Sequence, residues 1–146
     1  MNKKDYQEYV KIKSPNSETF KDCVFAFLIG GLISAVGQMI TIYLTNRGIP
    51  KEETSTITSI VLIFLGSLLT GLNIYDDIAK YAGAGTLVPI TGFANSIVAS
   101  AMEFKSEGFV MGMGAKMFTI AGPVIVFGVI SSVICGLIYY FSMVIL

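Results

Sequence analysis

The 146-residue sequence contains no histidine, no tryptophan and only two cysteines. Histidine is the commonest general base and metal ligand, so its absence argues against most acid–base enzymes and common metal sites. Cys23 and Cys135 lie far apart without metal-ligand spacing, and two cysteines are too few for a disulfide framework. We also find no nucleophile motif and no phosphate-binding loop. We therefore predict that the protein is not an enzyme and has neither a cofactor nor a metal site.

Charge is scarce as well. Only 14% of the residues are charged, against about 25% in soluble domains. The hydrophobic fraction is 53%, and the mean hydropathy is +0.72. Ten basic and ten acidic residues cancel, which excludes the bulk basic field that nucleic-acid binding needs. The composition predicts an integral membrane protein with the lipid bilayer, and no nucleic acid, as its partner.

Long uncharged runs predict the fold, because a membrane-crossing helix needs about 20 apolar residues. We expect an all-α, small polytopic membrane helix bundle with about four membrane-embedded segments, one or two of them broken or re-entrant. The expected segments lie at about 22–44, 57–79, 84–102 and 117–143.

The first 21 residues are polar and mixed in charge. They predict a polar N-terminal segment at 1–21 ahead of a membrane domain at 22–146. Five lysines precede the first apolar run, whereas the next loop contains only Arg47 and Lys51. Basic residues flank membrane helices on the cytoplasmic side, so we predict a cytoplasmic N-terminus.

The stretch GAGTLVPITGFANS, at 83–96, interrupts the most apolar part of the chain with glycine, proline and hydrogen-bonding side chains. Irregular backbone survives at membrane depth only when it is buried in protein or lines a wet cavity. One hypothesis is that the segment lines a path for a polar solute. The alternative is a proline kink that only shapes packing. The solute-path candidates here are Thr86, Pro89, Thr91, Gly92, Asn95 and Ser96.

A second interruption, GFVMGMGAKMFTIAGP, occupies 108–123. We expect residues 109–116 to form a short helix distinct from the last span, with the break at Gly122–Pro123 because proline lacks an amide donor. Lys116 stands alone among apolar residues. It either reaches the membrane interface along its aliphatic stem or supplies a fixed positive charge to an anionic solute, as a seventh solute-path candidate.

Residues around this second interruption are candidates for gating or subunit contact. They are Glu103, Glu107, Gly108, Gly112, Gly122 and Pro123. Small residues also recur at four-residue spacing, as in Gly128, Ser132 and Gly136. Such spacing allows helices to approach closely in lipid, either within one chain or between subunits.

The joined stretches LVPITGFANSIVASAMEFKSEGF and GMGAKMFTIAGPVIVFG resemble the stage V sporulation protein A family, most closely its AC type, to which the AEb type is related. The resemblance covers about 22–141. It implies a subunit of a channel or permease complex in the forespore and spore inner membrane, which moves dipicolinic acid with calcium and responds to membrane tension. The implied partners are an AEb-like paralogue and a soluble AD-like subunit. A structural subunit that scaffolds the complex, with the pore formed elsewhere, is the alternative.

Overall fold

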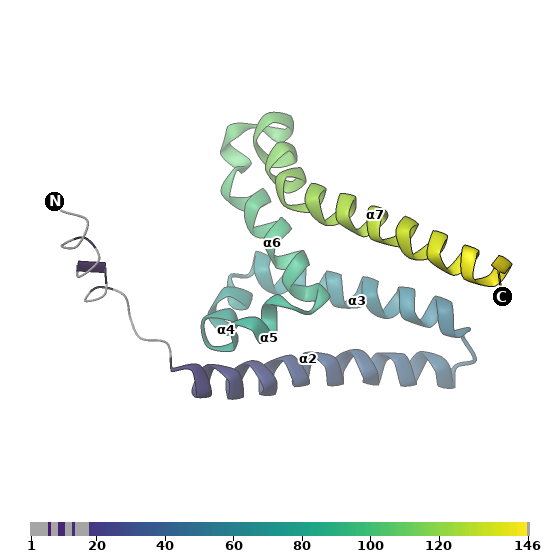
Figure 1. The fold of residues 1–146 in the computed structure, drawn as a ribbon. Helices are drawn as coiled ribbons and strands as arrows, with labels where there is room; N and C mark the ends of the chain where they lie inside the picture. Colours follow the sequence, from purple (N-terminus) through teal and green to yellow (C-terminus); the bar gives the residue numbers. More distant parts are fainter. Residues whose placement is uncertain (1–5, 7–8, 11–12, 14–17, 146) are drawn as a thin grey trace.

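The computed structural model describes residues 6, 9–10, 13 and 18–145. Most of the predicted N-terminal segment at 1–21, including Lys3, Lys4 and Lys11, therefore lies outside the described residues. Throughout the described part the regular structure is helical, without a strand, which confirms the predicted all-α class. Figure 1 shows the chain as an antiparallel pair of long helices, a group of short helices, and a long final helix.

The long pair consists of α2 (Thr19–Asn46) and α3 (Lys51–Gly71). Both are long and apolar enough to cross a membrane, and α2 contains the segment expected at 22–44. Facing hydroxyls join the two helices, since Thr41 Oγ1 and Thr58 Oγ1 lie 3.2 Å apart. Polar contacts of this kind help helices associate where lipid removes the hydrophobic effect.

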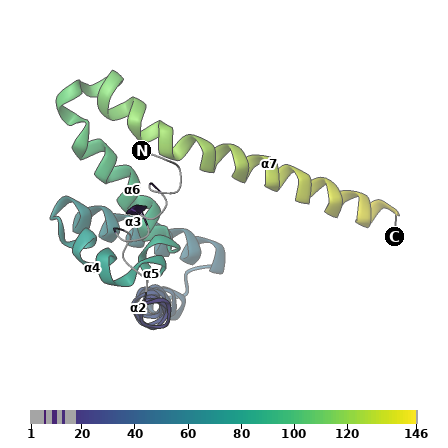
Figure 2. The ribbon, with the colours of Figure 1, turned by 60° about the vertical axis from the view of Figure 1, so that its left-hand side comes forward.

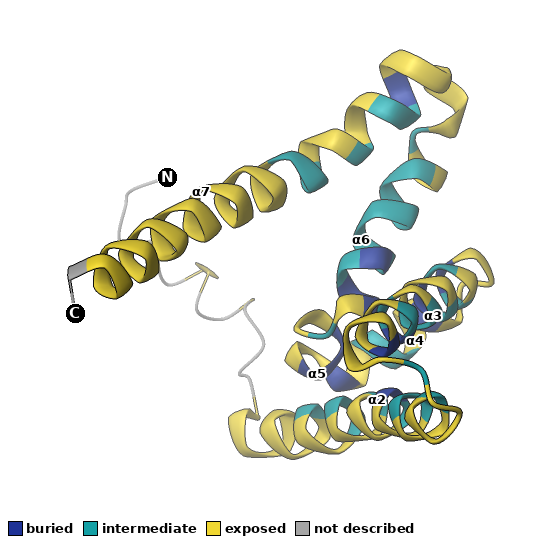
Figure 3. Cartoon of the chain, turned by 90° about the vertical axis from the view of Figure 1, so that its right-hand side faces the viewer, coloured by how far each residue is buried: buried dark blue, intermediate teal, exposed yellow. Residues whose placement is uncertain are grey.

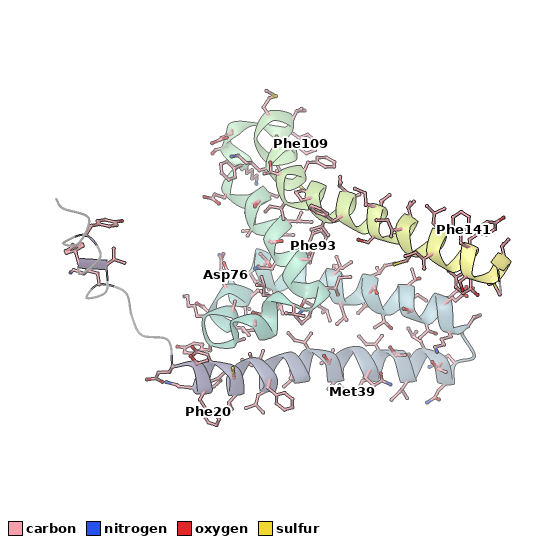
Figure 4. The ribbon with its side chains drawn as sticks, viewed as in Figure 1. Phe20, Met39, Asp76, Phe93, Phe109 and Phe141 are labelled. Atoms are coloured by element: carbon pink, nitrogen blue, oxygen red, sulfur yellow. The ribbon has the colours of Figure 1, made fainter. Side chains whose placement is uncertain are left out.

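The predicted bounds of the second segment, 57–79, are wrong at both ends. Helix α3 begins at Lys51 and ends at Gly71, and α4 (Ile74–Ala82) follows in a new direction. The cause is Asn73, whose φ of 59° is left-handed and cannot continue a right-handed helix. Helix α4 is amphipathic: Tyr75 and Ala82 are buried, whereas Asp76 points outward, as Figure 4 shows.

The segment expected at 84–102 is interrupted as predicted. It forms α5 (Ala84–Leu87) and α6 (Ile90–Glu103), separated by Val88 and Pro89. Pro89 is extended, with φ −64° and ψ 159°, and directly precedes the first residue of α6. The 14 residues of α6 extend about 21 Å, which is shorter than the roughly 30 Å hydrocarbon core. Helix α6 is thus too short to span a bilayer by itself.

After α6 the chain turns through η1 (Lys105–Glu107) into a π-helix, η2 (Phe109–Gly114), which runs directly into α7 (Ala115–Ile145). The predicted break at Gly122–Pro123 is wrong, because α7 continues through Pro123. One proline removes a single amide donor, and the remaining ladder of a long apolar helix holds it together in lipid. Residues 109–114 differ from the rest of this helical stretch only in their π-helical hydrogen bonding, which changes to α-helical at Ala115.

Helices α2 to α6 pack together, and α7 extends away from them (Figure 2). Every residue from Pro123 to Val144 is exposed, and the ribbon of α7 is accordingly yellow over most of its length in Figure 3. Among the described residues three helical stretches are long and apolar enough to span: α2, α3 and Phe109–Val144. The described part of the chain therefore contains three candidate spans, and the broken segment packs mainly against α2 and α3.

Candidate functional site

The broken segment at 83–96 passes very close to the backbone of α2 and also folds closely against itself. At Gly85, α5 lies directly on α2, and an added methyl group would overlap the carbonyl oxygen of Ala26. At Gly92, an added methyl group would collide with the carbonyl oxygens of Thr86 and Leu87. Both glycines are buried, so only glycine fits at these positions. Gly92 is thus placed by packing against the break itself.

Tyr75 of α4 connects the two sides of the break. Its hydroxyl oxygen lies 2.9 Å from the Thr86 carbonyl oxygen and 2.9 Å from Thr91 Oγ1. A tyrosine hydroxyl has one proton, and a carbonyl oxygen only accepts. Tyr75 is the donor toward both atoms, so its single proton is shared between the Thr86 carbonyl oxygen and Thr91 Oγ1. Tyr75, Thr86 and Thr91 are each at most 5% exposed, so this hydrogen-bonded chain is internal to the fold.

Thr86 also satisfies its own hydroxyl nearby. Its Oγ1 donates to the Gly83 carbonyl oxygen at 3.0 Å. The hydroxyls of Tyr75 and Thr86 thus bond to two carbonyl oxygens just before the interruption, those of Thr86 and Gly83. Unpaired backbone groups are costly in lipid, so the hydroxyls stabilise the irregular conformation.

Asn95 of α6 is bound to α3. Its side-chain oxygen lies 2.7 Å from Thr70 Oγ1, which is also 2.7 Å from the Gly66 carbonyl oxygen. Because the threonine hydroxyl has one proton, donation to Gly66 leaves Thr70 as an acceptor. The hydrogen bond between the two side chains then forms when the Asn95 amide is turned so that its NH₂ group donates to Thr70 Oγ1. This orientation is assigned from the surrounding hydrogen bonds.

The remaining candidates of the broken segment lie beside this network. Pro89 is half-buried at the start of α6, and Ser96 Oγ donates to the Phe93 carbonyl oxygen at 2.8 Å. Figure 4 labels Phe93 on α6. The structure thus brings Thr86, Thr91 and Asn95 against α3 and α4, whereas Ser96 bonds within its own helix.

Lys116 lies away from this network, at the other end of α6. Its Nζ is 4.2 Å from the centroid of the Phe104 ring, a cation–π contact. Phe104 follows Thr91 by 13 residues, or about 20 Å of helix. Lys116 is exposed beside this ring.

The gating and subunit-contact candidates divide between the turn and α7. Glu103, Glu107 and Gly108 are exposed around η1, and Gly108 has a φ of 99°. Gly112 is buried against Phe104 and Glu107, where a methyl group would not fit. Gly122 and Pro123 lie within α7.

Sequence reasoning missed Tyr75 and Thr70 as partners of the broken segment. Tyr75 follows the left-handed Asn73 in a short helix whose charged residues recur at three- and four-residue spacing on one face, which signals a half-buried helix. Thr70 lies four residues after Gly66, on the face of α3 that contacts α6. Neither signal identifies the bonding partner, because both partners are distant in sequence.

The chemistry available at this site is hydrogen bonding by hydroxyl, amide and backbone groups. Among the described residues no group of three or more acidic or cysteine side chains is arranged to hold a metal ion. The site can tie helices together or offer polar groups to a solute, and nothing in it resembles a set of catalytic groups.

Two comparisons place the chain among known proteins. Residues 22–138 match the protein family described as SpoVAC/SpoVAEB sporulation membrane protein. The chain is 45% identical over 139 residues to stage V sporulation protein AC of Bacillus subtilis (strain 168), covering 94% of this chain and 93% of that protein. No solved structure matches the chain.

Proposed function

Because the chain belongs to the SpoVAC/SpoVAEB family of sporulation membrane proteins, we propose that it is a subunit of a membrane complex that moves dipicolinic acid. The complex would carry dipicolinic acid, with calcium, into the developing spore and release it at germination. Its place would be the forespore and later the spore inner membrane, with the N-terminus in the cytoplasm. The observation that carries the proposal is the broken segment at 83–96, a polar interruption among candidate spans in a family of sporulation membrane proteins.

The chemistry of the segment suits the solute. Dipicolinate is a small dianion at neutral pH, and its calcium chelate carries less net charge. Hydroxyl, amide and backbone groups can contact either form without a buried counter-charge. Scarce charge within the apolar segments favours passive, gated passage over a pump with carboxylate relays, and membrane tension is the proposed trigger.

The hydrogen bonds limit where a path can run. Thr86, Thr91 and Asn95 are engaged with α3 and α4 within this chain. We therefore expect the solute to meet the half-buried side of the break, near Pro89, Asn95 and Ser96, at a boundary between subunits. Lys116 would then attract the anion from the far end of α6.

The proposed partners are other subunits of the same complex, an AEb-like paralogue and a soluble AD-like subunit. Exposed residues at the turn, Glu103, Glu107 and Gly108, and the residues Gly112, Gly122 and Pro123 next to it are the proposed points of gating or subunit contact. Three candidate spans are few for a pore formed by one chain, which also favours assembly.

A structural subunit is the second candidate function. The internal bonds Tyr75–Thr91 and Thr70–Asn95 favour it, because they give the polar groups of the break a purely structural role. Dipicolinate passage through liposomes that contain only this purified chain would exclude the scaffold hypothesis.

The decisive experiment compares two variants in sporulating cells. Asn95→Leu and Thr70→Val both remove the bond between α3 and α6, but only Asn95 is a solute-path candidate. If Asn95 lines the path, Asn95→Leu slows dipicolinate accumulation at normal protein level and partner pull-down, whereas Thr70→Val does not. Equal behaviour of the two variants, or normal accumulation in Asn95→Leu, would reject a role for Asn95 in the path.

A further inference from the structure

An apolar cavity of about 270 Å³ lies between α2 and α3. Its long walls are Ile29, Ile33 and Val36 from α2 and Leu62, Leu65 and Leu69 from α3. Tyr75 and Ile78 of α4 border it, together with Thr86 and Thr91 beside the break. We propose that this cavity binds a single acyl chain of a membrane lipid.

The lining determines the chemistry of the occupant. The polar atoms of Tyr75, Thr86 and Thr91 bond to one another and to the backbone, so the surface that they present to the cavity is hydrocarbon. Apolar cavities stay dry and accept apolar guests, and one of about 150 Å³ is already large enough for benzene. The lining offers no hydrogen-bond partner to water or a polar solute, so the cavity favours a hydrocarbon chain.

The position of the cavity identifies the source of that chain. Leu32 and Leu68 line the cavity and are 66% and 47% exposed, so its wall continues into the outer apolar surface of α2 and α3. Both helices are candidate spans, and the medium around that surface in a bilayer is lipid hydrocarbon. The cavity thus opens toward acyl chains.

The shape also fits a chain that lies along the helices. On α2 the lining extends from Ile29 to Val36, about 10 Å of helix axis. The cavity runs along the antiparallel helices α2 and α3, and membrane-crossing helices lie in the same direction as the lipid chains of a bilayer. The bound chain would touch the ring of Tyr75 and the methyl groups of Thr86 and Thr91, and so the broken segment.

The test measures lipid uptake by the purified chain. Protein stripped of lipid in detergent is titrated with palmitoyl lysophosphatidylcholine, and bound lipid is counted by native mass spectrometry. We expect saturable uptake of a single molecule per chain. Uptake that rises without saturation, or no uptake at all, would overturn the proposal.

Matched substitutions locate the site. Ile33→Phe and Leu65→Phe insert bulk into the cavity, whereas Ile42→Phe and Leu28→Phe make the same changes at positions of α2 that are 50% and 59% exposed. The larger side chains would occupy part of the cavity. Lipid binding should therefore weaken about tenfold in Ile33→Phe and Leu65→Phe and stay unchanged in the two control variants. Circular dichroism and elution volume verify folding. Equal binding in all four folded variants would place the lipid elsewhere.

A second copy of the chain is the competing occupant. Its side chains would fill the cavity only on association, so the titration is repeated on vesicle-reconstituted protein whose oligomeric state is measured by cross-linking. If self-association excludes the lipid probe, the cavity is a protein interface and the acyl-chain proposal fails. Uptake that persists in the associated protein supports it. Should both cavity-filling variants unfold, a lack of saturable uptake by the wild-type chain would still overturn the proposal.

Discussion

Thr70 of α3 and Asn95 of α6 meet side chain to side chain, with 2.7 Å between the threonine hydroxyl and the asparagine amide group. The bond joins a candidate span to the broken segment, across 25 residues of sequence. The bond gives the amide of Asn95 a partner within the apolar helices, so no ligand is needed to explain its presence there. Substitution of either residue measures what the bond contributes.

We expect Thr70→Val and Asn95→Leu to be energetically coupled. Each variant removes one partner of the same bond, so the double variant should lose less stability than the sum of the single losses. Interhelical hydrogen bonds in membrane proteins contribute about 0.6 kcal/mol on average, and the coupling should be of that size. Unfolding in mixed detergent micelles measures it. Ser96→Ala is the control, because Ser96 bonds only within its own helix; coupling of Ser96 to Thr70 would contradict the assigned contact.

Glycine-to-alanine substitutions should have opposite effects on stability at the break and on α7. Gly92→Ala places a methyl group against two carbonyl oxygens and should destabilise the fold by roughly 3 kcal/mol. Gly128→Ala meets nothing within 4 Å and should stabilise α7 by roughly 0.5–1 kcal/mol through helix propensity. Thermal unfolding followed by circular dichroism compares them. If Gly128→Ala instead impairs pull-down of partner subunits, the small-residue face of α7 is a subunit contact.

Removal of one hydroxyl tests the network around the break. Tyr75→Phe keeps the ring against the cavity but leaves the Thr86 carbonyl oxygen without its donor, at a cost of about 1–3 kcal/mol. Tyr81→Phe is the matched control, since Tyr81 lies in the same helix and is 71% exposed. We expect Tyr75→Phe to speed hydrogen exchange of amides in 84–96 and Tyr81→Phe to leave it unchanged. Equal exchange rates would show that the hydroxyl does not hold the break.

Variants of Lys116 distinguish its two predicted roles. Lys116→Met removes the charge, and Phe104→Leu removes the ring under it, so each should cost about 0.5–1 kcal/mol of stability at this exposed contact. Spore dipicolinate content is then measured at matched protein level. A fixed charge that attracts the anion predicts reduced accumulation in Lys116→Met, recovery in Lys116→Arg, and normal accumulation in Phe104→Leu. A merely structural contact predicts that Lys116→Met and Phe104→Leu behave alike.

Properties that depend on local chemistry could be predicted from the sequence. Uncharged length predicts membrane helices, because water-free surroundings require every backbone group to bond within its own segment. The interruption at Val88–Pro89 follows from a residue without an amide donor, next to residues that disfavour α-helix. The joined stretches LVPITGFANSIVASAMEFKSEGF and GMGAKMFTIAGPVIVFG indicated the family that the comparisons then showed.

Other properties were decided by contacts that only the folded chain makes. The turn at Asn73 lies in an uncharged run, and its left-handed backbone is stable because α4 then packs Tyr75 against Thr86 and Thr91. Pro123 and Pro89 are the same residue type, yet α7 continues through one and α6 begins after the other. The difference is tertiary: the turn before α6 is held by Tyr75 and by close approach at Gly92, whereas Pro123 is exposed on a helix that packs against little else. Sequence identifies a residue that can break a helix, and the neighbours available to bond the freed groups decide whether it does.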